Sequence, residues 1–264
     1  MSDAIPMPPA MVRRVRDFRG PAAVPRAAAT VVLLRPRDPF EVYVLRRAAT
    51  MVFGGRYAFP GGGVDPSDRP ETLRTDWSER LGVPDEQARA VVGAAVRELF
   101  EEAGVLLAGP VGEPDRTLGD VSAPDWEADR VAVAARELTL SDLLHARGLR
   151  LRDDLLLPWA RWVTPEFEPK RFDTRFFVAA VPTGQRPRDV SGEADDTVWL
   201  PVSEAVARHD AGGLAMLPPT IVALREISAF GSVAEVLAAP REVRPVLPRL
   251  ARDGGRLWLQ LEDS

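Results

Sequence analysis

The sequence contains no cysteine, a single lysine and two histidines among 264 residues. The absence of cysteine excludes disulfides, a thiolate nucleophile and the zinc sites that use cysteine ligands. No run of 18 uncharged apolar residues occurs, so we predict no membrane-spanning segment. A formal net charge of −5 argues against general affinity for nucleic acid or anionic membranes. We therefore expect a soluble, cytoplasmic protein with neither nucleic acid nor a membrane as its partner.

The length and the 45% hydrophobic content suit one large domain with insertions. Residues 1–25 contain five prolines and predict an extended or disordered arm. Residues 28–34 and 41–47 read as two short strands around a proline-containing turn, which predicts a hairpin. Later strands are predicted at 158–183 and 195–200, and the chain from about 201 mixes short helices with a proline-rich end.

Three carboxylates, those of Glu98, Glu101 and Glu102, crowd onto about one helical turn. Glu98 is three residues from Glu101 and four from Glu102, so all three project from one side of a helix. Like charges at these spacings destabilise a helix by a few tenths of a kcal/mol per pair unless something neutralises them. Hard divalent cations with oxygen ligands do this well. The run predicts a Mg²⁺ or Mn²⁺ site, and a solvated acidic helix end is the alternative.

The helix that carries these carboxylates is predicted to begin at Asp85 as its N-cap and to end near Ala103, with Gly104 as a left-handed stop. One stripe of this helix is apolar and is predicted to pack in the core: Val92, Val96, Leu99 and Ala103. Upstream lies a turn, Phe59-Pro60-Gly61-Gly62-Gly63, whose glycines allow the backbone to approach a metal site or substrate closely.

This glycine turn, followed by Arg97, the three carboxylates and Gly104, resembles the Nudix motif. The resemblance implies the fold class α/β: a Nudix α/β/α sandwich with a mixed sheet and mainly helical insertions. It also implies that Glu98, Glu101 and Glu102 bind Mg²⁺ or Mn²⁺ and that a water hydrolyses a nucleoside diphosphate linked to another group. Arg97 would pair with a carboxylate to fix the ligand geometry, and direct contact with phosphate is the alternative.

Compared with the compact motif, the spacing from Gly62 to Arg97 contains an insertion of about 21 residues, and Arg89 stands where the family has its first Glu. The insertion with Trp77, together with Thr164-Pro165 and the run 170–177, resembles the branch of peroxisomal coenzyme A diphosphatases. That branch implies cleavage of coenzyme A or acyl-CoA to 3′,5′-ADP and 4′-phosphopantetheine. Residues 26–264 would form a single domain with excursions at about 64–84 and 109–157 and a C-terminal extension from about 201.

For the substrate, Arg46, Arg47 and Arg56 are candidate anchors of phosphate, together with Gly61 and Gly62. Glu193 is the candidate general base, and a solvated loop acid is the alternative reading of that residue. Two other functions stay open at this point: hydrolysis of ADP-ribose, NADH or dinucleoside polyphosphates, and nucleotide sensing without catalysis. A small-molecule nucleotide is the expected partner, and a homodimer is compatible with the sequence.

Overall fold

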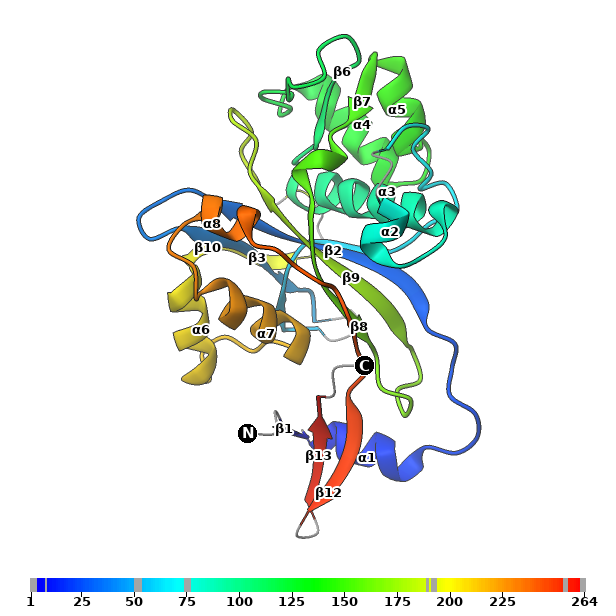
Figure 1. The fold of residues 1–264 in the computed structure, drawn as a ribbon, viewed down its shortest axis with the longest axis vertical. Helices are drawn as coiled ribbons and strands as arrows, with labels where there is room; N and C mark the ends of the chain where they lie inside the picture. Colours follow the sequence, from blue (N-terminus) through cyan, green and yellow to red (C-terminus); the bar gives the residue numbers. More distant parts are fainter. Residues whose placement is uncertain are drawn as a thin grey trace.

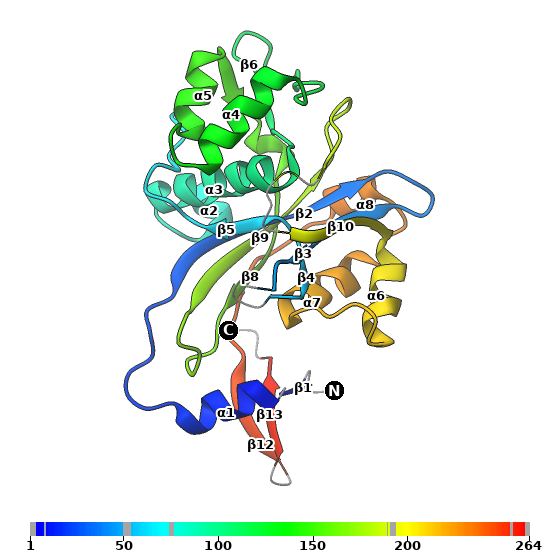
Figure 2. The same cartoon turned by 180° about the vertical axis from the view of Figure 1, so that it is seen from behind.

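The computed structural model describes residues 4–7, 9–49, 54–73, 77–188, 190, 194–253 and 256–261. A mixed sheet runs through the molecule in the order β10-β3-β2-β9-β8-β11, with β4 beside β3 and β5 beside β2 (Figures 1 and 2). Its strands are β2 (Arg26–Arg35), β3 (Glu41–Arg47), β4 (Tyr57–Ala58), β5 (Gly61–Gly63), β8 (Leu157–Val163), β9 (Phe172–Ala180), β10 (Ala194–Pro201) and β11 (Pro245–Val246).

Strand β2 is the centre of the sheet and has two partners on one of its edges. Along its other edge it pairs in parallel with β9. On the shared edge, β5 pairs with the first half of β2 and β3 pairs with its end, both antiparallel. The hairpin predicted from residues 28–34 and 41–47 is therefore confirmed. This division places the glycine strand β5 beside the first half of β2, on the same side of β2 as β3.

Helices cover both faces of the sheet (Figure 1). On one face lie α2 (Trp77–Leu81), α3 (Asp85–Ala103), α4 (Pro124–Ala134) and α5 (Leu140–Ala146), with β6 (Ala108–Pro110), β7 (Leu149–Leu151) and the 3₁₀ turn η1 (Asp153–Leu155). On the other face lie α6 (Val202–Asp210), α7 (Pro218–Ile227) and α8 (Val233–Ala238). Alternate residues of β2 enter two separate apolar cores, Val31 and Leu33 on the α3 side and Val32 and Leu34 on the α7 side. The α/β sandwich with helical insertions is thus confirmed.

The carboxylate helix α3 has nearly the predicted bounds, but the predicted cap is wrong. Pro84 occupies the N-cap position, and no side chain caps the helix there. Asp85 is instead the first helical residue, and its carboxylate accepts a hydrogen bond from Arg89 Nε at 2.7 Å. Gly104 ends the helix with φ 63°, as predicted. The predicted apolar stripe is fully buried.

The predicted N-terminal arm is also wrong in part, because it contains β1 (Ala4–Pro6) and helix α1 (Pro9–Asp17). Pro9 stands in the first turn of α1, where a missing N–H costs nothing, and β1 is an edge strand, which tolerates Pro6. Strand β1 pairs with β13 (Arg256–Gln260), and β13 pairs with β12 (Arg249–Asp253). This three-stranded terminal sheet lies beside α1 at one end of the molecule (Figures 1 and 2).

Within the described ranges, none of the helices combines the length and the apolar character that crossing a membrane requires.

Candidate active site

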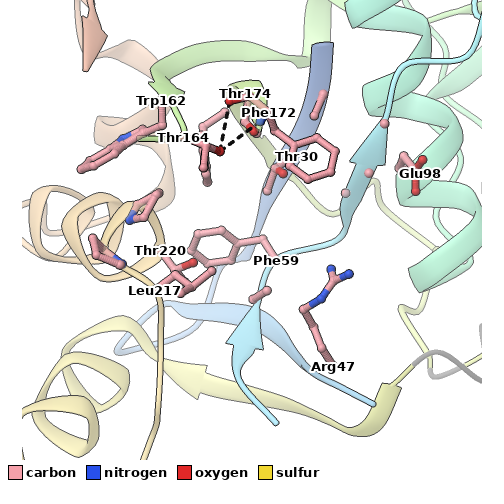
Figure 3. A pocket seen from close by; sticks show the side chains of 18 of the residues that line it. Thr30, Arg47, Phe59, Glu98, Trp162, Thr164, Phe172, Thr174, Leu217 and Thr220 are labelled. Atoms are coloured by element: carbon pink, nitrogen blue, oxygen red, sulfur yellow. Dashed lines mark hydrogen bonds between the residues drawn. The ribbon is translucent and has the colours of Figure 1, made fainter. Parts of the chain in front are cut away.

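Helix α3 brings its three carboxylates against the glycine strand β5. Glu98, Glu101 and Glu102 are each at most 8% exposed. The backbone N–H of Gly61 donates to Glu102 Oε2 at 2.8 Å, which ties β5 to the helix. Glu98 lies across this strand from the other pocket residues labelled in Figure 3. The structure therefore brings together the glycines and carboxylates that the sequence analysis selected.

The closeness of β5 to the helix explains why glycine is needed at two positions. A Cβ atom at Gly62 would lie 2.5 Å from Glu98 Oε1, and one at Gly61 would lie 2.5 Å from the hydroxyl of Thr30. Both separations are far shorter than a van der Waals contact. Side chains here would displace the carboxylate or the neighbouring strand, so the glycines leave Glu98 accessible from the pocket.

Arg97 is 2% exposed and joins the carboxylates to the insertion that follows β5. Its Nη1 donates to Glu98 Oε1 at 2.7 Å and to Glu101 Oε1 at 3.1 Å. Its Nε and Nη2 donate to both carboxylate oxygens of Asp68, at 2.6 and 2.9 Å, and Nη2 also donates to the carbonyl of Gly63 at 2.8 Å. The guanidinium thus makes the pairing with carboxylates that was expected of it.

Asp68 was not among the predicted site residues, although the sequence analysis noted the insertion that carries it. Its side chain is 2% exposed, and its Oδ2 also accepts from the backbone N–H of Asp65 at 2.8 Å. Arg89, which stands where the family has a Glu, donates to the carbonyls of Pro70 and Glu71. Asp68 and Arg89 together attach the inserted loop to α3.

The electrostatics of this cluster are dominated by buried negative charge. Burial raises the pKa of Glu98 to about 7, although the charge of Arg97 opposes the shift. Burial also raises the pKa of Glu101, again against Arg97. For Arg97, burial works to lower the pKa, but Asp68, Glu98 and Glu101 outweigh it, so the pKa lies above its ordinary value. The cluster favours any added positive charge.

A hard divalent cation would supply that charge, since the donors are carboxylate oxygens. In the described part of the chain, however, no three acidic or histidine side chains converge on one point that could hold a metal ion. The carboxylate oxygens of Glu98, Glu101 and Glu102 accept instead from Arg97, Arg136 and the Gly61 N–H. The donor chemistry of these carboxylates fits Mg²⁺ or Mn²⁺.

The carboxylates open into a pocket of about 710 Å³, which lies within the usual range of ligand sites. Of the predicted substrate anchors, Arg47, Gly61 and Gly62 line this pocket. The described residues Arg46 and Arg56 are not in its lining, and Arg46 faces Asp195 at 3.7 Å. The predicted base, Glu193, lies outside the described residues.

Arg136 is a pocket residue that sequence reasoning missed. It follows the end of α4 with φ 62°, which is unusual for a residue other than glycine. Its Nη1 donates to Glu101 Oε1 at 2.7 Å, and its side chain is 45% exposed. No motif signals this residue, because its position depends on how the second excursion folds back onto α3.

A crystal structure of a NUDIX hydrolase from Alicyclobacillus acidocaldarius is 32% identical to this chain. The match covers 83% of this chain and 98% of that one, with a TM-score of 0.67. The chain belongs to the Nudix hydrolase family. No family model matches the sequence of this Nudix hydrolase.

Curated relatives of this Nudix hydrolase are more distant. A putative nudix hydrolase 7 from Caenorhabditis elegans is 29% identical over 204 residues, covering 77% of this chain and 60% of the relative. Acyl-coenzyme A diphosphatase NUDT19 from Gallus gallus is 26% identical over 271 residues, covering 83% of this chain and 70% of the relative. The chain thus spans about 60 to 70% of the length of these two relatives.

Proposed function

We propose that this Nudix hydrolase cleaves the phosphoric anhydride of coenzyme A or an acyl-CoA, with Mg²⁺ or Mn²⁺, to 3′,5′-ADP and 4′-phosphopantetheine or its acyl form. The observation that carries the proposal is one pocket that joins the buried carboxylate cluster to a largely apolar space. A relative named acyl-coenzyme A diphosphatase adds support.

In this proposal Glu98, Glu101 and Glu102 hold the metal. When bound, a divalent ion neutralises phosphate oxygens and lowers the pKa of a water. The protein's own part is positioning: Arg97 aligns Glu98 and Glu101, Asp68 aligns Arg97, and the Gly61 N–H holds Glu102. Removing such hydrogen-bond partners of metal ligands typically lowers metal affinity or activity by about 10- to 100-fold.

Two arginines are assigned to the diphosphate itself. Arg47 and Arg136 both line the pocket, together with the glycines of β5. A guanidinium offers paired N–H donors that match phosphate oxygens. We assign no substrate contact to Arg46 and Arg56, because they do not line the pocket.

The general base remains a prediction on Glu193, which precedes β10 in the sequence. Replacing Glu193 with Gln should lower kcat by about 100-fold or more if this carboxylate removes a proton from the attacking water. An unchanged kcat would assign that role to another group.

The proposed function is tested by product analysis with purified protein and either Mg²⁺ or Mn²⁺. Coenzyme A, octanoyl-CoA, ADP-ribose, NADH and diadenosine tetraphosphate are compared at equal concentration, and products are separated by anion-exchange chromatography. We expect 3′,5′-ADP from the two coenzyme A substrates at the highest kcat/KM. Faster cleavage of ADP-ribose, NADH or diadenosine tetraphosphate would replace this proposal with the corresponding pyrophosphatase. Nucleotide binding without any product would indicate a sensing module.

A further inference from the structure

Away from the carboxylates the pocket lining is mainly apolar, with a few polar side chains among the apolar ones. Trp162 and Leu217 lie on the side opposite Glu98 (Figure 3). We define the hydrocarbon chamber by six apolar residues of the pocket lining: Met11, Trp162, Phe172, Leu217, Pro248 and Leu259. Trp162 is 5% and Leu259 is 2% exposed, so the chamber walls are packed against the protein.

The chamber is assembled from segments that are far apart in the sequence. Met11 belongs to α1 and Leu259 to β13, while Trp162 and Phe172 come from the paired strands β8 and β9. Arg14 of α1 donates to both carboxylate oxygens of Glu168 at 2.7 and 2.9 Å. Helix α1 is therefore attached to the tip of the β8–β9 hairpin, and both α1 and the terminal sheet contribute residues to the pocket wall.

Two polar side chains near this end, those of Glu168 and Thr164, already have hydrogen-bond partners within the protein. Glu168 also lines the pocket, but it is 4% exposed and paired with Arg14. The hydroxyl of Thr164 accepts from the N–H of Phe172 at 3.0 Å and donates to its carbonyl at 3.3 Å. A ligand with polar edges, such as adenine, would lose hydrogen bonds to water here without replacement.

We propose that the hydrocarbon chamber binds the acyl chain of an acyl-CoA, so that α1 and the terminal sheet determine acyl-chain preference. The inference rests on the proposed function. In such a substrate the pantetheine arm separates the acyl chain from the phosphoric anhydride, as the length of the pocket separates the chamber from Glu98. Burying one methylene group strengthens binding by about fourfold, so binding should depend steeply on the length of the acyl chain.

The experiment tests the inference by filling the chamber with larger side chains. Met11→Trp and Leu259→Trp add volume to its walls, and Leu250→Trp is the matched control. Leu250 lies on β12 directly opposite Leu259, is 38% exposed and does not line the pocket. The measured quantity is the ratio of kcat/KM for octanoyl-CoA to that for coenzyme A. We expect a ratio of at least about tenfold in the wild type and in Leu250→Trp, and a ratio near one in the two filled variants.

A second measurement separates this inference from the proposed function. Calorimetric titration of the metal-free protein with S-octanoyl-pantetheine, which has no phosphoric anhydride, reports the chamber alone. Binding that is lost in Met11→Trp but kept in Leu250→Trp supports the inference even when coenzyme A is not hydrolysed. Hydrolysis of coenzyme A and octanoyl-CoA with equal efficiency by the wild type overturns the inference and leaves the proposed function intact. Loss of adenosine 3′,5′-bisphosphate binding alone in the filled variants also overturns it.

Discussion

At the charged end of the pocket each buried carboxylate accepts a hydrogen bond from the protein, whereas the apolar end is formed where separate segments meet. Glu98 and Glu101 accept from Arg97, and Glu102 accepts from the Gly61 N–H. The apolar end depends on α1, which is attached through Arg14 and Glu168, and on the terminal sheet. The comparison indicates that the charged end holds its carboxylates in fixed positions for catalysis. The apolar end provides a surface for a part of the ligand that can vary.

The largest effect should come from Glu102→Gln, which removes a charged metal ligand but keeps the side chain's shape. We expect kcat to fall by at least about 100-fold, with an unchanged thermal midpoint in metal-free buffer. Glu113→Gln, an exposed glutamate on the surface, serves as the control. If Glu102→Gln turns over substrate as fast as the wild type, the carboxylate cluster takes no part in the hydrolysis.

A smaller loss is expected from Asp68→Asn, because this change weakens the paired hydrogen bonds to Arg97 without touching a metal ligand. We expect kcat to fall by about 10- to 100-fold with little change in KM. Metal affinity, measured by Mn²⁺ titration, should weaken in parallel. Asp65→Asn is the control in the same loop. If both variants behave alike, the loop rather than the Asp68 carboxylate is responsible.

The charged end should also carry a cost in stability that the apolar end lacks. The pKa of Glu98 is raised by burial to about 7 from 4.5, so folding favours its protonated form. In metal-free protein the contribution of protonated Glu98 to stability is fully present below pH 4.5 and is lost as the pH rises through 7. Relative to Glu98→Gln, the wild type should therefore be equally stable at low pH and about 3 kcal/mol less stable well above pH 7. Urea unfolding of both proteins across this range checks the sign, and a constant difference would contradict it.

The smallest effect is expected at Arg136, which lies at the exposed rim of the charged end. Arg136→Ala should raise KM for a diphosphate substrate about fivefold and leave kcat nearly unchanged, because it removes binding rather than catalysis. Arg136→Lys should restore part of the loss. Arg116→Ala, an exposed arginine outside the pocket, is the control. A fall in kcat alone would assign Arg136 to positioning of Glu101.

Helix α3 could be predicted from the sequence because its signals are local. The apolar stripe, the three carboxylates and Gly104 all lie within one helix and its cap. Asp68 could not be selected, because its pairing with Arg97 across 29 positions depends on the path of the inserted loop. The terminal sheet was missed for a similar reason, since β1 and β13 pair across almost the whole chain.

The adjacent arginines of β3 illustrate a further limit. Successive side chains of a strand point to opposite faces, so Arg46 and Arg47 cannot both enter one pocket. The sequence offers no local signal for which of the two faces the ligand. In the structure Arg47 lines the pocket and Arg46 faces Asp195.

The excursion at 109–157 has a consequence for any attempt to shorten this protein. Arg130, which is 4% exposed, donates to the main-chain carbonyl of Glu101 at 2.9 Å, and Glu127 holds both Arg130 and Arg188. Arg188 in turn donates its N–H to the carbonyl of Ala103 at 3.1 Å. Removing the excursion would take away the donor to the Glu101 carbonyl and the Glu127 carboxylate that pairs with Arg188. A compact derivative would therefore need a new donor for that carbonyl and a new partner for Arg188 to keep the last turn of α3 and its acidic residues in place.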